Sequence, residues 1–271
     1  MIFRISTPRM ELWRIDGPFS NDPHQHEDEY QITVPMYGTF RFTQENRDYQ
    51  LAAGGGLVQH PRERHVFEIE GEAGVLIFKV RQESLREFAR RDSLELDLRQ
   101  HFDPALLAGR FRQWVRRLLA YDPVDPLAQE EAESTVMSYL CDALSGNHRI
   151  AGAAGSGRRA AASGSGGFLA QVADYIHAHY TDPVSIDELA AIAMQSRYHF
   201  IRTFKAAFGV TPYQYVLRLR IDEAKRLLRR SGRSVTDIGV SLGFSGGSAF
   251  YRAFLKTVGD TPEHYRQAGG D

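Results

Sequence analysis

The sequence is poor in cysteine and has no long apolar run. Its 271 residues include one cysteine, Cys141, which excludes a disulfide framework, a cysteine-rich zinc module and a CxxC redox site. The longest apolar stretch, around Val75 to Phe78, is far shorter than the ~20 residues that a membrane helix needs, and the first residues have no apolar signal core. We therefore expect a cytoplasmic protein without a membrane partner.

The chain also lacks a net charge of either sign, but the sum conceals two opposed halves. Lys and Arg number 33 against 34 Asp and Glu, which gives −1. Residues 1–167 hold 20 basic and 24 acidic side chains, whereas residues 168–271 hold 13 and 10, so the halves carry −4 and +3. This asymmetry indicates that the second half approaches an anionic partner.

A segment without large apolar side chains divides the chain. Residues 151–167 read AGAAGSGRRAAASGSGG and cannot contribute to a packed core. At roughly 150 residues per domain, the chain has room for about two domains. We predict a flexible linker over residues 147–167, followed by a C-terminal domain over residues 168–267.

The pattern of the N-terminal part changes near residue 80. Between Tyr30 and Val80, short alternating or β-branched runs are separated by Gly, Asn and Asp, which is typical of a small antiparallel barrel or sandwich. From Glu83 to Leu144 the apolar residues instead recur at three and four positions, as in amphipathic helices. We predict a mainly-β domain over residues 1–80. A helical extension over residues 81–146 would either cover it or form a dimer interface.

The C-terminal part contains an internal repeat of 49 to 50 residues. Seven positions correspond at an offset of 50, from Phe200 with Phe250 to Tyr215 with Tyr265. Three earlier positions correspond at an offset of 49, pairing Ser185, Glu188 and Ser196 with Ser234, Asp237 and Ser245. So ordered a series indicates two copies of one structural unit.

Each copy has the parts of a helix-turn-helix. In the first, Ser185 and Glu188 form a capping box that begins a short helix, and residues 194–195 form the turn. Ser196 is expected to cap a second helix, which ends at Gly209. In the second copy the equivalent capping residues are Ser234 and Ser245.

A strongly helical, basic stretch joins the two copies. Residues 218–230 read RLRIDEAKRLLRR, with five Arg and one Lys. A rigid helix of this kind would hold two recognition helices about one DNA turn apart, ~34 Å, if both enter the major groove on one face. The alternative is an all-α scaffold in which the repeat reflects duplication alone, but the capped helices and the positive charge favour DNA binding.

Most of the C-terminal part follows one known pattern. The stretches SIDELAAIA, SRYHFIRTFKAAFGVTPYQYVLRLRIDEAKRLL and SVTDIGVSLGFSGGSAFYRAFLKTVGDTPEHYR match it nearly end to end. Residues 168–267 thus resemble the DNA-binding domain of the AraC/XylS family of bacterial transcription regulators. The resemblance implies double-stranded DNA as a partner, and RNA polymerase as a second one in an activator. It also implies DNA contacts by Arg197, Tyr198, Ile201 and Arg202 in the first recognition helix and by Gly247, Ser248, Tyr251 and Arg252 in the second.

Within these residues, Arg202 is the strongest candidate for base recognition, because its guanidinium can meet O6 and N7 of guanine together. Its repeat partner, Arg252, can do the same or bond a phosphate. Gly246 and Gly247 stand where the family commonly carries polar side chains. We therefore expect the second helix-turn-helix to make mainly backbone contacts and the first to supply most of the sequence discrimination.

The N-terminal part carries a weaker pattern built around three histidines. Five residues follow the spacing of the first cupin motif and two resemble the second: Gly17, His24, His26, Gln31 and Gly38, then Pro61 and His65. Residues 17–80 thus resemble a cupin. Gln31 stands where metal-binding cupins place Glu, so the resemblance is imperfect at the fourth ligand.

The histidines suit a metal site. Residues 24 and 26 of a strand point to the same face, so two imidazoles can project together. With His65 from a neighbouring strand they form a three-nitrogen site suited to Zn, Ni, Fe or Cu. The Gln31 amide oxygen is a poorer ligand than a carboxylate, which Glu27 or Glu29 would have to supply. Two alternatives remain open, namely contact with an organic effector without metal and no ligand role.

The sequence therefore predicts a multidomain protein, with a mainly-β cupin-like barrel and appended helices before an all-α domain that carries two helix-turn-helix motifs. We expect a homodimeric, DNA-binding transcription regulator that is controlled by a small molecule or metal ion, and not an enzyme. The hypothesis from another class is a metal-dependent cupin enzyme fused to a DNA-binding domain. The complete DNA-binding domain and the imperfect fourth ligand argue against it.

Overall fold

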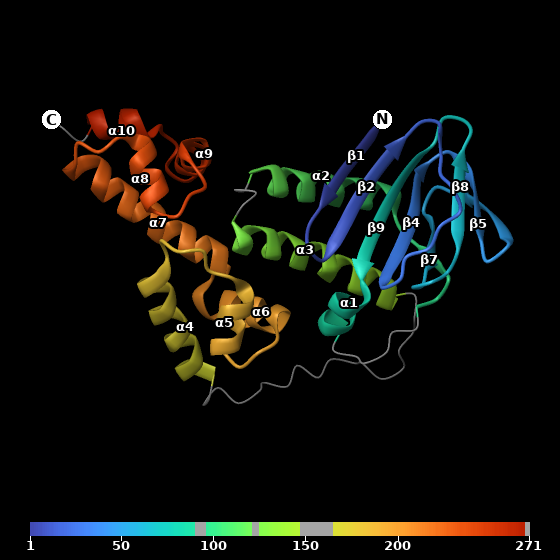
Figure 1. The fold of residues 1–271 in the computed structure, drawn as a ribbon, viewed down its shortest axis with the longest axis horizontal. Helices are drawn as coiled ribbons and strands as arrows, with labels where there is room; N and C mark the ends of the chain where they lie inside the picture. Colours follow the sequence, from blue (N-terminus) through green and yellow to red (C-terminus); the bar gives the residue numbers. More distant parts are fainter. Residues whose placement is uncertain (90–95, 121–124, 147–164, 269–271) are drawn as a thin grey trace. The chain divides into compact units, whose positions relative to one another are not determined.

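The computed structural model describes residues 1–89, 96–120, 125–146 and 165–268 (Figure 1). The chain forms two compact units. Unit 1 comprises Met1–Trp114 and Thr135–Gly155, and unit 2 comprises Val115–Ser134 and Ser156–Asp271. Most of the linker predicted at residues 147–167 lies outside the described residues. Among these, no helix is both long and apolar enough to cross a membrane.

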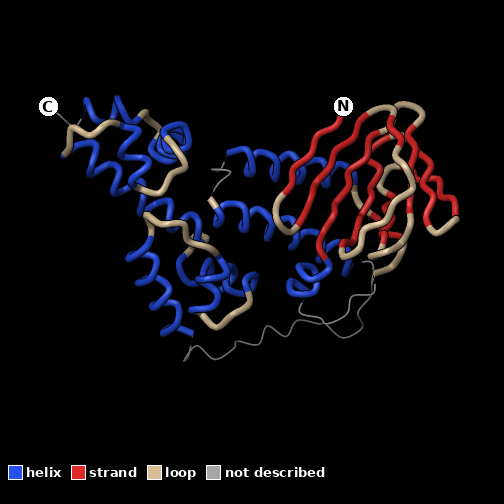
Figure 2. The backbone as a smooth tube through the Cα atoms, viewed as in Figure 1, coloured by secondary structure: helices blue, strands red, loops and turns tan. Residues whose placement is uncertain are grey.

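Unit 1 holds all the strands of the described chain, which Figure 2 shows in red. One sheet has the order β1-β2-β9-β4-β7-β10 and the other has the order β3-β8-β5-β6, with antiparallel pairing throughout. Their bounds are β1 Ile2–Ser6, β2 Met10–Asp16, β3 Phe19–Ser20, β4 Glu29–Tyr37, β5 Thr39–Gln44, β6 Arg47–Ala52, β7 Gly55–Gln59, β8 His65–Ile69, β9 Gly74–Arg81 and β10 Arg99–His101.

The core of this unit lies between the two sheets. Alternation along β5 turns Phe40 and Phe42 inward, where they join Phe67 of β8 and Val75 and Ile77 of β9 in one buried cluster. The β5–β6 hairpin turns at two residues of positive φ, as the primed two-residue turns require. The predicted β-rich, cupin-like fold is confirmed.

Two parts of this fold differ from the sequence expectation. The strand pattern between Tyr30 and Val80 leaves out β1, β2 and β3, although MELWRID in β2 alternates apolar and polar residues. In addition, β10 lies within residues 81–146, which were expected to be helical throughout. This three-residue strand pairs with Gly55–Leu57 of β7 and depends on that long-range pairing, since it is too short to carry a period of its own.

Three helices follow β9 in the chain, namely α1 Gln82–Ala89, α2 Pro104–Ala120 and α3 Pro126–Gly146. The parts of α2 and α3 that belong to unit 1 pack against the larger sheet. Phe78 of β9 meets the Trp114 ring of α2 with centroids 6.0 Å apart, and Trp114 meets Tyr139 of α3 at 5.3 Å. The helical extension therefore covers the barrel, which is one of its two expected roles. On α3, burial raises the pKa of the half-buried Cys141 thiol to about 12, so the thiol is unreactive at neutral pH.

Unit 2 contains the predicted pair of helix-turn-helix motifs. Its C-terminal helices are α4 Ser165–His179, α5 Ile186–Ile192, α6 Arg197–Phe208, α7 Pro212–Arg230, α8 Val235–Ser241, α9 Gly247–Val258 and α10 Pro262–Ala268. The starts of α5 and α8 differ by 49 residues, whereas those of α6 and α9, and of α7 and α10, differ by 50. The sequence repeat is thus a structural repeat.

The helix starts match the prediction in part. Ser185 and Glu188 form the expected capping box, and Ser234 accepts from the Asp237 N–H at 3.0 Å. Of the caps predicted for the two recognition helices, one is confirmed in position and one is wrong. Ser196 is the N-cap residue of α6, although its side chain makes no cap hydrogen bond. The N-cap of α9 is Gly246 instead of Ser245. The inserted residue between the copies moves the start of α9 one position along the chain.

A buried arginine holds the two copies together. Arg220 of α7 is 3% exposed, and its Nη1 donates to Asp125 Oδ2 at 2.9 Å. Its Nε and Nη2 donate to the carbonyls of Tyr180 and Asp182 at 2.6 and 3.1 Å. The guanidinium also lies over the Phe244 ring of the second copy, 5.7 Å from its centroid. Arg220 is therefore structural, although the basic stretch around it suggested DNA contact.

A buried carboxyl of α3 lies at the start of α7. Glu131 is 8% exposed and accepts from the Tyr213 N–H at 2.6 Å. Burial raises the pKa of Glu131 to about 7, although hydrogen bonds from Thr211 and Tyr213 favour the charged form. The start of α3 is therefore built into unit 2 through Glu131 as well as Asp125.

We expect Gly243→Ala to destabilise unit 2 more than Gly259→Ala. Both glycines have left-handed φ, +82° and +84°, so each substitution costs about 1 kcal/mol from the backbone alone. A Cβ at Gly243 would also lie 2.4 Å from the Thr181 carbonyl oxygen, whereas one at Gly259 meets nothing within 4 Å. The total for Gly243→Ala should reach about 3 kcal/mol in denaturant unfolding followed by circular dichroism. Equal losses would contradict this packing.

Glu131 should make the stability of unit 2 depend on pH. Its pKa rises from 4.5 to about 7 on folding, so the folded protein keeps a proton that the unfolded chain releases. The free energy of unfolding should therefore fall as pH rises from 4.5 to 7, by up to about 3 kcal/mol from this group. Glu131→Gln should remove this pH-dependent contribution to the free energy of unfolding.

The measurement is thermal unfolding of both proteins at pH 5 and pH 8. The difference in melting temperature between Glu131→Gln and the wild type, variant minus wild type, should be larger at pH 8 than at pH 5. Asp174→Asn, which removes an exposed carboxylate of α4, is the matched control. The same pH dependence in wild type and Glu131→Gln would refute the assignment.

Candidate functional site

The first recognition helix, α6, presents one of its four predicted DNA contacts. Arg202 is exposed. The other three are buried in this conformation, with Arg197 3% exposed, Tyr198 2% and Ile201 7%. Their role in DNA binding stays a prediction, and it requires a conformation that exposes them.

The second recognition helix, α9, is more open. Ser248 and Arg252 are exposed, and Tyr251 is half-buried. Close packing favours glycine at residue 247, because a Cβ there would lie 2.9 Å from Thr236 Oγ1 of α8. A side chain at residue 247 would therefore be crowded by α8, whereas a Cβ at Gly246 would meet nothing within 4 Å.

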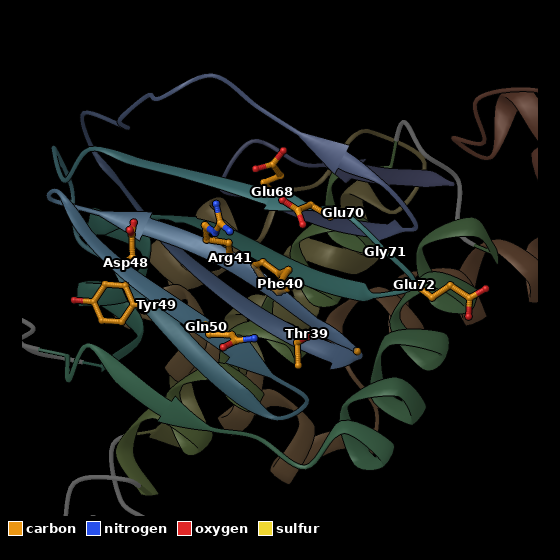
Figure 3. A pocket seen from close by; sticks show the side chains of 11 residues that line it. Thr39, Phe40, Arg41, Asp48, Tyr49, Gln50, Glu68, Glu70, Gly71 and Glu72 are labelled. Atoms are coloured by element: carbon orange, nitrogen blue, oxygen red, sulfur yellow. The ribbon is translucent and has the colours of Figure 1, made fainter.

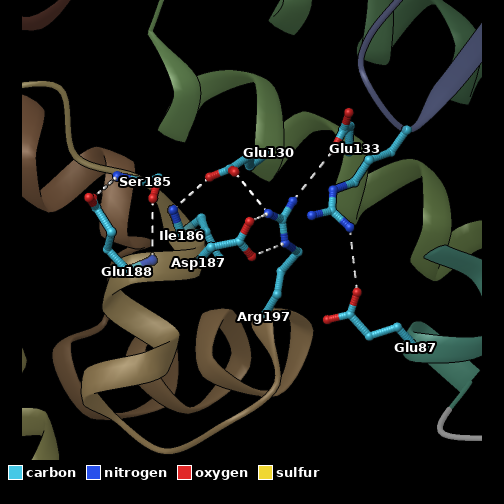
Figure 4. A network of polar contacts seen from close by, with 9 residues as sticks. Glu87, Glu130, Glu133, Ser185, Ile186, Asp187, Glu188 and Arg197 are labelled. Atoms are coloured by element: carbon cyan, nitrogen blue, oxygen red, sulfur yellow. Dashed lines mark hydrogen bonds and ion pairs between the residues drawn. The ribbon is translucent and has the colours of Figure 1, made fainter. Parts of the chain in front are cut away.

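Arg197 is surrounded by carboxylates (Figure 4). Its Nε donates to Asp187 Oδ1 and its Nη2 to Glu130 Oε1, both at 3.0 Å. Its Nη1 lies 3.9 Å from Glu133 Oε2. Sequence reasoning missed these acids of α3, because Glu130 lies 67 residues before Arg197 and no local spacing connects them.

The three predicted metal ligands of unit 1 converge. The ring centroids are 4.4 Å apart between His24 and His65, 5.1 Å between His24 and His26, and 5.3 Å between His26 and His65. Their candidate ligand atoms all lie within 4.8 Å of one another. Reciprocal backbone hydrogen bonds of 3.0 and 2.8 Å join His24 to His65 and fix this pair.

Hydrogen bonds select the ring nitrogen that each histidine offers. His24 Nδ1 bonds the Asp22 carbonyl at 2.8 Å, and His65 Nδ1 bonds the Glu63 carbonyl at 3.0 Å. A carbonyl only accepts, so each Nδ1 carries the proton and each Nε2 keeps its lone pair. Among the described residues, the buried His65 Nε2 has no hydrogen-bond partner. Burial, with lesser effects of His24 and His26, lowers the pKa of His65 to about 4, so its ring is neutral at pH 7.

Gln31 is placed to position a histidine. Its Oε1 lies 3.2 Å from His26 Nε2, so the ring donates from that atom and keeps its lone pair on Nδ1. Its Nε2 donates to Thr33 at 3.1 Å, and Thr33 donates to Gln59 at 3.0 Å. From Gln59 the chain of hydrogen bonds continues to Gln44 at 3.3 Å. Glutamines at inward positions of three strands were a signal of this buried polar network that the sequence reasoning passed over.

The two glutamates considered as a fourth ligand lie differently. Glu29 Oε2 is 3.8 Å from His26 Nδ1, within reach of the histidine cluster. Glu27 instead pairs with Arg62, Nε to Oε2 at 3.3 Å, and both side chains are largely exposed. Glu29 is therefore the better candidate for the carboxylate, and burial raises its pKa above the ordinary value.

A separate hollow lies on the smaller sheet (Figure 3). It has a volume of ≈ 800 Å³. Arg41 and Glu68, which face each other across β5 and β8, both line it and are exposed. None of the three clustered histidines lines it, so it is distinct from the site that the sequence indicates.

Comparison with known proteins covers both parts of the chain. Residues 4–141 match the AraC-binding-like domain family, and residues 189–268 match a helix-turn-helix domain family. The chain is 26% identical to the HTH-type regulator YobQ of Bacillus subtilis over 90% of this chain and 88% of that protein. It is also 26% identical to the activator RhaS of Escherichia coli over 92% of this chain and 89% of that protein.

Other matches are confined to shorter parts. A solved AraC-type regulator from Chromobacterium violaceum is 30% identical with a TM-score of 0.37, over 40% of this chain and 96% of that chain. The chain spans less than half the length of three further curated relatives, between 30% and 46%. The two family matches and the two relatives that align over most of the chain point to the same family. The chain belongs to the AraC/XylS family of DNA-binding transcription regulators, with a cupin-like binding domain before its helix-turn-helix domain.

Proposed function

We propose that this regulator responds to a metal ion or small molecule bound at His24, His26 and His65, and that occupancy changes its binding to specific DNA sequences. The observation that carries the proposal is the buried, unpartnered Nε2 of His65 beside two other imidazoles. A buried acceptor without a donor is costly, so a ligand that occupies it is favoured.

The donor set favours a divalent metal among the possible ligands. Each of the three rings holds one nitrogen in a hydrogen bond to oxygen and keeps the other for coordination. Such outer partners are what fixes the tautomer of metal-binding histidines. Zn, Ni, Fe and Cu accept imidazole nitrogen. Glu29 or a small molecule would complete the coordination.

The remaining organisation is also proposed. Residues 1–80 act as the sensor, residues 81–146 support a homodimer, residues 147–167 form a tether, and residues 168–267 bind double-stranded DNA. The exposed Leu106 of α2, 53% accessible, supports an interface there. A ligand that binds one conformation of the sensor better shifts the population of DNA-binding states. The protein would act in the cytoplasm, with RNA polymerase as a further partner in an activator.

A metal-dependent enzyme is the second candidate, because three histidines with an open position also suit metal-assisted catalysis. An activity screen of the metal-loaded protein tests it. The full-length relatives that match are named as regulators, which supports the regulatory assignment.

Selection of tight-binding duplexes from a random-sequence pool, at fixed salt, tests the DNA function. With a selected duplex, Arg202→Ala should relax base preference at one position by about tenfold, because a bidentate guanine contact is lost. Arg252→Ala should weaken binding to all sequences more evenly. Affinities measured across site variants will separate the two effects. Equal loss of specificity in both variants would refute this division of roles.

Calorimetric titration of chelator-treated protein with Zn²⁺ or Ni²⁺ tests the ligand site. We expect one ion per chain in the wild type. His65→Ala should weaken binding by about 100-fold or more, since loss of a ligand's outer partner alone costs roughly 10- to 100-fold. His101→Ala removes an exposed histidine of β10 and should leave affinity unchanged. Metal binding should also shift the affinity for the selected duplex by about fivefold or more. Unchanged affinity in His65→Ala would reject this site.

A further inference from the structure

The start of α3 carries a group of carboxylates that contact the helix-turn-helix domain. We call residues 125–133 the acidic segment. It belongs to the same compact unit as α4 to α10. Its carboxylates are Asp125, Glu130, Glu131 and Glu133, and three of them, all but Glu130, are at most 9% exposed.

Glu130 holds the starts of both helices of the first motif. Its Oε1 accepts from Arg197 Nη2 at 3.0 Å, where α6 begins. Its Oε2 accepts from the backbone N–H of Ile186 at 2.7 Å, where α5 begins. Glu133 adds a second carboxylate 3.9 Å from Arg197, and both of these side chains are 2% exposed. Glu130 and Glu133 of the acidic segment therefore bind polar groups at the starts of α5 and α6.

Apolar contacts and a third carboxylate extend this attachment. Leu127 and Ala128 belong to the same buried cluster as Phe200 and Ile201 of α6. Glu131 accepts from the backbone N–H of Tyr213, the first N–H donor of the 19-residue helix α7 after Pro212. The acidic segment is thus packed against the first motif by both apolar and charged groups.

The groups that it holds are of the kind that bind DNA. Arginine side chains supply many of the contacts to DNA phosphates. A carboxylate on such a group occupies the place of a phosphate oxygen, and its charge repels the duplex. Arg197, Tyr198 and Ile201, which lie at the start of α6, are all buried in this arrangement.

The second motif has no equivalent attachment point. The repeat places Gly247 at the position of Arg197, and Gly247 has no side chain that a carboxylate can hold. Arg252 of the second motif is exposed. The contact is therefore specific to the first copy and does not follow from the shared fold.

We propose that the acidic segment is an intramolecular latch that competes with DNA for the first helix-turn-helix. In the latched state α6 exposes Arg202 but buries Arg197, Tyr198 and Ile201. Full engagement of the first motif therefore requires release of Glu130 and Glu133 from Arg197. This inference rests on the proposed function in that DNA is the competitor, and it does not depend on what the histidine cluster binds.

Glu130→Gln in the full chain is the direct test. Glutamine has one acceptor oxygen in place of two and no charge, so it cannot hold Arg197 and Ile186 together. Affinity for the selected duplex should rise about tenfold, the effect of one lost charge-assisted hydrogen bond. Asp174→Asn on the exposed face of α4 is the matched control, because it removes the same charge without touching the latch. A rise no larger than the control's, or a fall, would overturn the proposal.

Hydrogen exchange of the wild-type chain gives a second test that does not depend on how the variant folds. On binding the selected duplex, peptides that cover residues 125–134 should lose protection while peptides of α9 gain it. Retained or increased protection of residues 125–134 would overturn the latch even with DNA bound. If no duplex can be selected, the DNA function itself fails, which is a distinct result from binding without release.

Discussion

A guanidinium that is buried in a protein must be surrounded by oxygen atoms, and this constraint organises the helical unit. Arg197 and Arg220 are each 3% exposed. Removing one partner of such a buried pair typically costs about 3–5 kcal/mol, because a charge is left uncompensated. The partners of Arg220 include Asp125, and those of Arg197 include Glu130 and Glu133. The start of α3 is therefore part of the helix-turn-helix unit although it precedes the linker predicted at residues 147–167.

Local pattern was enough to predict the two helix-turn-helix motifs, because capping and apolar period depend on residues a few positions apart. The capping box at Ser185 and the αL termini at Gly209 and Gly259 are signals of this kind. Burial of Arg197 and Tyr198 could not be predicted in this way. Periodicity assigns a residue to a face of its helix, but it does not say which distant segment packs on that face.

The histidine cluster shows the same division between local and distant information. Cupin-like spacing predicted His24, His26 and His65, and the structure brings them together. The same spacing placed Gln31 at the position of the fourth ligand, and the structure shows its amide bonded to His26 and to Thr33 of a buried network. That role depends on Thr33 and Gln59, whose strands pair across the sheet, and the motif contains no information on that pairing.

The backbone bridge between His24 and His65 has a consequence for how a signal can begin. His24 and His65 are joined by an isolated bridge of two backbone hydrogen bonds, so the proposed ligand has little chain entropy to remove. The binding free energy of the ligand is therefore not reduced by the cost of ordering the site. The Gln31 amide links the histidine cluster to Thr33 through hydrogen bonds. A ligand bound at the histidine cluster would act on the sheet by rearranging hydrogen bonds and not by folding a loop.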